Sequence, residues 1–98
     1  MNKNDAKKYL ANVAGDKVFW VNNGSLLKNL VDLEKCLSTM SDAAYAYHAN
    51  KTKNDFSNWT RNVIGDAELA LSLTEAKNKS AALKKVKKRV ENLKKAAK

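Results

Sequence analysis

The last 22 residues, 77–98, place the strongest constraint on how this chain folds, because they carry both a helical apolar pattern and most of the basic residues. Apolar residues recur in this segment every three or four positions: Leu83, Val86, Val90 and Leu93. This spacing predicts an amphipathic helix with Ser80 as its N-cap, about 27 Å long at 1.5 Å per residue. Its apolar stripe has to be covered, so we expect the helix to dock on the rest of the chain.

The net charge of the chain lies in the same segment. Residues 77–98 hold ten of the 19 basic residues and one acidic residue, Glu91, whereas residues 1–76 are electrically balanced. A neutral body joined to one cationic element is typical of a protein that binds a polyanion. An AT-rich coding bias would also produce many lysines, but it would not leave the body balanced and the final segment basic.

Length and composition favour one folded domain, residues 1–98, with a modest core that needs no structural metal site or disulfide bond. The single Cys36 lies in an apolar-periodic segment, which is typical of a buried, unreactive thiol in a reducing compartment. No stretch approaches the roughly 20 apolar residues of a membrane span. The N-terminal residues lack the apolar core of a signal peptide. We therefore expect a cytoplasmic protein, associated with the nucleoid if it binds DNA.

The N-terminal third predicts a short helix followed by a hairpin. Asn4 and Asp5 can cap a helix over residues 6–13, with Gly15 just past its end, although residues 1–16 can also be flexible. Two apolar runs within residues 17–28 flank Asn23-Gly24, which is the sequence signature of a β-hairpin with a type I′ turn. Because two strands alone are marginal in water, this hairpin should pack on helices.

The remainder reads as helices with capping residues between them. Asn29 caps a helix that continues to Met40, and Ser41-Asp42 starts a short one. Residues 49–54 form a polar loop, and further helices start at Asn54 and Asp66, separated by Gly65 and ending near residues 76–78. The predicted fold class is α+β and mostly helical: an N-terminal helix, one β-hairpin, then four or five helices ending in a long basic amphipathic helix.

A second cluster of unusual residues, 47–61, invites catalytic interpretations. His48 and Asp55 are too few for a metal site, since no second His or ligating Cys accompanies them, and no Ser or Thr is singled out as a nucleophile. We prefer a structural interpretation, in which His48 and Asp55 hydrogen-bond loop backbone while Phe56 and Trp59 enter the core. No catalytic residue, metal ligand or cofactor is predicted, so we do not expect an enzyme.

The same region resembles an uncharacterised prokaryotic domain family. The resemblance rests on a His followed by Asn-Asp-Phe-x-x-Trp and then Gly-x-x-x-Leu-Ala, and it covers about residues 18–73. The matching positions are His48, Asn54, Asp55, Phe56, Trp59, Gly65, Leu69 and Ala70. The resemblance implies a compact α+β domain and no particular activity. The basic final segment lies outside it.

Nucleic acid is the polyanion that this composition favours as a partner, and DNA more than RNA. Lysine suits phosphate contacts as a flexible point charge, whereas base recognition uses fixed geometry. We therefore expect duplex DNA bound through phosphates with little sequence specificity. The candidate contacts in the final helix are Lys84, Lys85, Lys87, Lys88, Arg89, Lys94 and Lys95, with Lys51, Lys53 and Arg61 extending the surface. RNA stays open because Phe19, Trp20, Tyr45 and Tyr47 could stack on bases, although we expect most of them in the core.

A protein-interaction module is the alternative from a different class. The hairpin edge or the 47–61 region would bind a partner, and the basic helix would pair with an acidic surface or aid solubility. A homodimer formed through the apolar stripe of the final helix is a variant of this hypothesis. A membrane partner is disfavoured, because the stripe is narrow and lacks Trp and Phe.

Overall fold

The computed structural model describes all 98 residues and confirms the predicted class: a small α+β fold, about two thirds helical, with one two-stranded hairpin. Six α-helices are joined by short connections, with a 3₁₀ turn (η1) before the hairpin and a π-helical segment (η2) that continues α4. In chain order the elements are α1 (Lys3–Leu10), η1 (Gly15–Lys17), β1 (Phe19–Trp20), β2 (Leu26–Leu27), α2 (Leu30–Thr39), α3 (Asp42–His48), α4 (Asp55–Trp59), η2 (Thr60–Ile64), α5 (Ala67–Glu75) and α6 (Lys79–Ala96).

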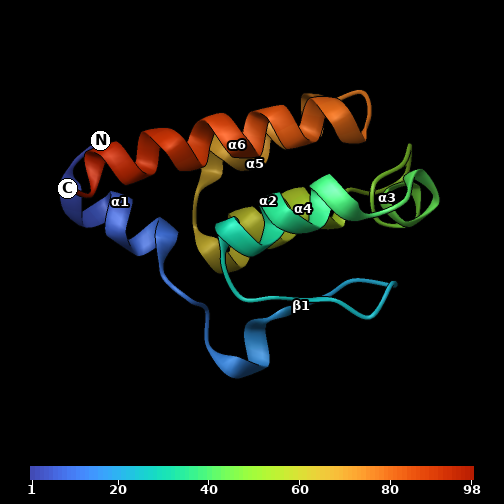
Figure 1. Cartoon of the computed structure of the whole chain (residues 1–98), viewed down its shortest axis with the longest axis horizontal. Helices are drawn as coiled ribbons and strands as arrows, with labels where there is room; N and C mark the ends of the chain where they lie inside the picture. Colours follow the sequence, from blue (N-terminus) through green and yellow to red (C-terminus); the bar gives the residue numbers. More distant parts are fainter.

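The elements form layers with α6 on one side and the hairpin on the other (Figure 1). α6 packs on α2, α1 and α5, and β2 packs on the opposite side of α2. One hydrophobic cluster of 20 buried residues runs between these layers. Phe56 is at its aromatic end, where its ring stacks on Phe19 at 5.3 Å and on Tyr45 at 5.6 Å between centroids. The fold therefore has a single core. Every α-helix except α3 packs extensively on at least one other α-helix.

Side-chain caps explain where the helices begin. The predicted caps Asn29, Ser41, Asn54 and Asp66 are confirmed, since each side chain accepts a hydrogen bond from the backbone N–H three residues later. Such a bond satisfies one of the N–H groups that a helix start leaves without a partner. Gly65, which ends η2, has a φ of 93° that favours glycine, so the predicted end of that helical segment is also confirmed.

Two helix starts differ from prediction. Asn2, rather than Asn4, caps α1, and Asn78, rather than Ser80, caps α6 through a 2.8 Å bond from the Ala81 N–H. In both cases two good capping residues lie two positions apart, and the more N-terminal of the two is the cap. α1 also ends at Leu10, earlier than predicted, so Gly15 is not its C-terminal glycine and instead begins η1.

The hairpin is present where predicted, with a different turn. Phe19 pairs with Leu27 and Trp20 with Leu26, which leaves a loop of three residues, 22–24, between Val21 and Ser25. Only Gly24 has a positive φ, at 92°, whereas a type I′ turn needs positive φ at two central residues. The turn is therefore the three-residue kind in which a left-handed glycine completes the loop.

The final helix docks through the predicted stripe. Val86, Val90 and Leu93 are buried, as is Ala82, while Leu83 is half-buried. The N-terminal helix packs against it, with Ala6 of α1 completely buried. Residues 1–16, which the sequence also allows to be flexible, therefore include a helix that belongs to the packed body.

Candidate nucleic-acid interface

The solvent face of α6 carries a row of lysines. Lys85 is half-buried and five lysines are exposed: Lys84, Lys87, Lys88, Lys94 and Lys95. All of these ammonium groups are free of salt bridges, which in this protein involve His48, Lys53, Lys79 and Arg89 instead. Glu91 is the one acidic residue of the helix. The row therefore offers uncompensated positive charge along a rigid element.

Arg89 is the exception among the predicted contacts in α6. Its Nε lies 2.8 Å and its Nη2 2.9 Å from the two carboxylate oxygens of Asp66, and Nη1 lies 3.4 Å from Glu68. These bonds raise the pKa of the guanidinium above its ordinary value, despite the opposing effect of burial. The Asp66 side chain is only 1% exposed, so this paired arginine joins α6 to α5. The charge of Arg89 is therefore satisfied within the protein and is not free for a phosphate.

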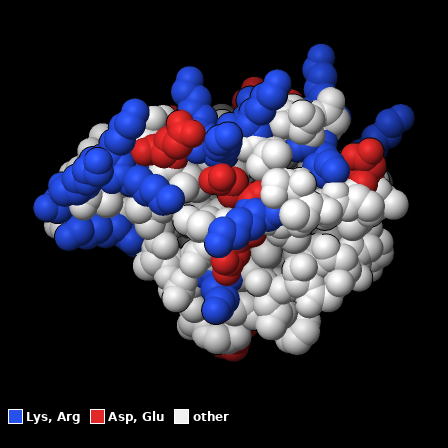
Figure 2. Space-filling model, viewed as in Figure 1, with Lys and Arg blue, Asp and Glu red and all other residues white.

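The structure adds a second source of positive charge that the sequence patterns did not indicate. Lys3, Lys7 and Lys8 of α1 are exposed, and α1 packs directly on α6. Figure 2 shows basic side chains gathered at the end of the molecule where α1 and the end of α6 lie side by side, with a few acidic side chains nearby. The candidate surface is therefore formed by two helices rather than one.

Three residues outside α6 were predicted to extend the contact surface, and they have different surroundings. Lys53 pairs with Asp55 at 3.0 Å and lies 5.0 Å above the ring of Tyr47, so its charge is partly satisfied within the protein. Lys51 is exposed in the loop near the start of α6 and has no salt bridge. Arg61 is exposed on η2, which packs on α1 and α5. Lys51 and Arg61 keep free charges.

The four aromatic residues considered for base stacking divide evenly between core and surface, so the expectation that most of these four are buried is wrong. Phe19 and Tyr45 are buried. Trp20 is 69% and Tyr47 57% exposed. Alternation along β1 turns Phe19 to the core and Trp20 outward, where its cross-strand neighbour Leu26 is also exposed. This exposed pair lies on the hairpin, across the molecule from α6 (Figure 1).

The buried His48 and the half-buried Asp55 form a hydrogen-bond network that ties the hairpin to α4. The backbone N–H of Asn22 donates to Nε2 of His48 at 3.0 Å, so the ring proton lies on Nδ1. Nδ1 in turn donates to Asp55 at 2.9 Å. Both ring nitrogens are therefore occupied, and the imidazole has no lone pair left for a substrate proton. The structural interpretation is confirmed for His48, whereas Asp55 bonds the side chains of His48 and Lys53 rather than backbone.

The other members of this cluster also have structural roles. Phe56 is 1% and Trp59 7% exposed, which confirms both as core residues. The indole N–H of Trp59 donates to the Lys17 carbonyl at 2.9 Å and fixes η1 on α4. Asn54 caps α4 and also donates to the carbonyl of Leu73. The cluster holds the hairpin, α4 and α5 together.

Asp55 should make part of the protein's stability depend on pH in the acidic range. Burial alone raises the pKa of this carboxyl, but hydrogen bonds and charge from His48 and Lys53 outweigh it and lower the pKa below its ordinary value. A carboxyl with a lowered pKa contributes stability above its unfolded pKa and loses it as pH falls through the folded pKa. We therefore expect stability to fall below about pH 4, and Asp55→Asn to lack that component. Urea unfolding at a series of pH values measures it. Equal acid-induced losses in both proteins would contradict this role.

The structure contains no group of three or more His, Cys, Asp or Glu residues placed to hold a metal ion. No helix is both long enough and apolar enough to cross a membrane. No family model, curated protein or solved structure matches the chain. The resemblance of residues 18–73 to an uncharacterised family therefore stays a prediction, and function has to be proposed from the site itself.

Proposed function

We propose that this protein binds double-stranded nucleic acid, DNA in preference to RNA, through phosphate contacts with little sequence specificity. The observation that carries the proposal is the row of exposed, unpaired lysines on α6, next to the three exposed lysines of α1. Duplex DNA presents one negative charge per roughly 1.7 Å of axis, so a straight helix lined with ammonium groups is suited to its backbone.

Two features of the row support phosphate contact rather than base recognition. Its free cations are lysines, which bind phosphate as point charges, whereas the one arginine of α6 is bound to Asp66. The helix is also docked along its apolar stripe, so its lysines are displayed before any ligand arrives. Neighbouring lysines on one face repel each other by about 0.2–0.5 kcal/mol per pair at one-turn spacing. A polyanion along this face would relieve that repulsion.

A salt titration tests the proposal. We expect a mixed-sequence DNA duplex of about 30 base pairs to bind at micromolar concentration or below, with a slope of log affinity against log salt near −5 if five or six phosphates are neutralised at about −0.9 each. The matching RNA duplex and single strand are measured alongside. Absence of duplex binding at low salt, or binding that salt hardly weakens, would rule the proposal out.

A protein-interaction module is a second candidate, and one observation favours it. Trp20 and Leu26 are neighbours on the outer face of the hairpin, and an exposed tryptophan on a strand is a common anchor of a protein interface. This candidate uses the opposite side of the molecule from α6. A protein partner whose binding depends on Trp20 but not on salt would favour it over duplex binding.

A further inference from the structure

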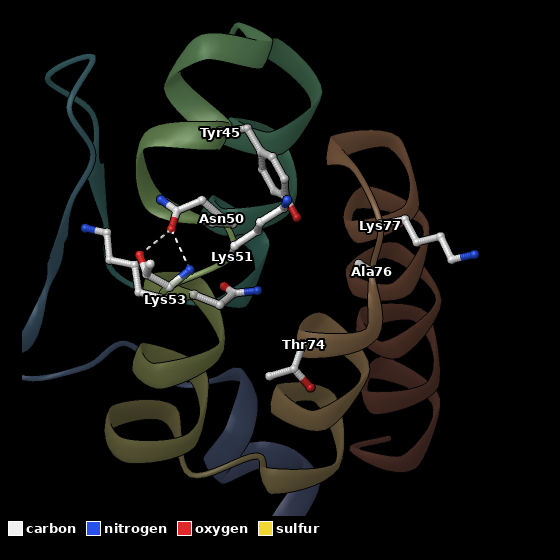
Figure 3. A pocket seen from close by; sticks show the side chains of 10 residues that line it. Tyr45, Asn50, Lys51, Lys53, Thr74, Ala76 and Lys77 are labelled. Atoms are coloured by element: carbon white, nitrogen blue, oxygen red, sulfur yellow. Dashed lines mark hydrogen bonds between the residues drawn. The ribbon is translucent and has the colours of Figure 1, made fainter.

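A hollow of about 510 Å³ lies beside the loop 49–54, between α3 and the connection from α5 to α6 (Figure 3). This volume is within the range of small-ligand pockets. The lining includes three lysines, Lys51, Lys53 and Lys77, and no acidic residue. Its electrostatic character therefore favours an anion.

Most polar side chains around the hollow already have partners and fix its shape. Asn50 accepts hydrogen bonds from the backbone and hydroxyl of Thr52, and Asn54 bridges α4 and α5. The Thr74 hydroxyl donates to a carbonyl of its own helix, and Lys53 is paired with Asp55. These groups are held by contacts within the protein and have little capacity left for a ligand.

Tyr45 differs, because its ring is fixed while its hydroxyl is free. The residue is 8% exposed, and the ring stacks on Phe56 at an interplanar angle of 13°. Its hydroxyl has no hydrogen bond within the protein. Because every fully buried polar side-chain atom has a partner, this hydroxyl cannot be fully buried, and it reaches the surface of the hollow that Tyr45 lines. Burial raises the pKa of this phenol, which therefore stays protonated and able to donate at neutral pH.

The two lysines without partners lie on different sides of the hollow, and Lys51 is the one that approaches this hydroxyl. In Figure 3 the ring of Tyr45 descends from α3, and the side chain of Lys51 extends toward it. Lys77 lies across the hollow with its side chain turned outward in this view. Its flexible stem allows the ammonium group to reach a ligand at the rim.

We propose that this hollow is a binding site for a phosphate monoester, with the Tyr45 hydroxyl and the Lys51 ammonium contacting the phosphate and Lys77 closing the rim. Charge-assisted hydrogen bonds to phosphate are stronger than neutral ones. The size of the hollow leaves room for an organic group beyond the phosphate, such as that of a mononucleotide. The site uses none of the lysines of α6 or α1 on which the duplex proposal rests, and Lys51 is the one predicted nucleic-acid contact that it includes. Its ligand is either a free phosphorylated metabolite or the terminal phosphate of a nucleic-acid strand.

Calorimetric titration at low ionic strength tests the site. Adenosine 5′-monophosphate is the probe, and adenosine, which lacks the phosphate, is the control ligand. We expect the monophosphate to bind and adenosine not to bind. Tyr45→Phe removes a hydroxyl that bonds nothing in the protein, and Lys51→Gln changes an exposed side chain, so both variants should fold as the parent does. Each should weaken monophosphate binding by about tenfold, the effect of one hydrogen bond to a charged group. Lys28→Gln, which changes an exposed lysine outside the hollow and outside α6 and α1, is the control and should leave this affinity unchanged.

Several results would overturn the proposal: no heat from the monophosphate, equal binding of adenosine, or parent-like affinity in both Tyr45→Phe and Lys51→Gln. Single strands with and without a 5′-phosphate then separate the two sources. A terminal phosphate that tightens strand binding in the parent but not in Tyr45→Phe identifies strand ends as the ligand. Monophosphate binding without that effect identifies a free metabolite. Duplex affinity, which depends on α6, is measured separately, so either proposal can fail without the other.

Discussion

Replacing Lys84, Lys88 and Lys95 together with glutamine should weaken duplex DNA binding on the order of several hundredfold at 0.1 M salt, because each phosphate contact contributes about 0.9 to the salt slope. The slope itself should become shallower by about 2.7 for three lost contacts. All three side chains are exposed, and none has a salt bridge to lose. The variant should therefore stay folded, and fluorescence anisotropy at several salt concentrations measures both effects.

The matched control removes the same charge from elsewhere on the surface. Lys17, Lys28 and Lys35 are also exposed and unpaired, and they lie on η1, before α2 and on α2 rather than on α6 or α1. Their triple replacement by glutamine lowers the net charge by the same amount as the α6 variant does. It should therefore weaken binding only through the long-range electrostatic field of the protein. Equal losses in the two triple variants would show that net charge, rather than the α6 row, determines binding.

The largest effect on stability is expected at Arg89. Arg89→Met leaves the Asp66 carboxylate buried without its counter-charge, and breaking a buried ion pair in this way costs about 3–5 kcal/mol. Asp66 also caps α5 through the Leu69 N–H at 3.1 Å, so the disturbance reaches the start of that helix. Equilibrium denaturation in urea measures the change in unfolding free energy.

A second variant separates loss of the pair from loss of the arginine itself. Adding Asp66→Asn to Arg89→Met removes the buried charge and retains a side chain that can cap α5, so it should recover part of the lost stability. Arg89→Met should also leave duplex affinity nearly unchanged under conditions in which it is folded. A large loss of affinity with little loss of stability would instead return Arg89 to the contact surface.

Much of the fold followed from local chemistry. Helix starts at Asn29, Ser41, Asn54 and Asp66 could be predicted because a cap depends on one side chain and a backbone group three residues away. The type of the hairpin turn and the first residue of α6 were harder to predict from the sequence. A Gly24 that supplies positive φ is compatible with two turn lengths, and Asn78 and Ser80 are both good caps, so the local sequence does not decide between the alternatives in either case.

The candidate sites show the same division. The lysines of α6 could be predicted, because charge and helical spacing are both properties of one segment. The pairing of Arg89 with Asp66, 23 residues earlier, could not, since only the folded chain places α6 against α5. The contribution of α1 and the meeting of Tyr45, Lys51 and Lys77 at one hollow likewise depend on tertiary packing.

The two tryptophans give the protein a pair of optical reporters with opposite surroundings. Trp20 is 69% exposed on the hairpin, whereas Trp59 is 7% exposed, with its indole N–H bound to a carbonyl. A soluble quencher such as acrylamide should reach the first in the folded protein and the second only after unfolding. Trp20→Phe would leave an emission signal that follows the core alone. Trp59→Phe would leave one that follows events at the hairpin, including the arrival of a protein partner.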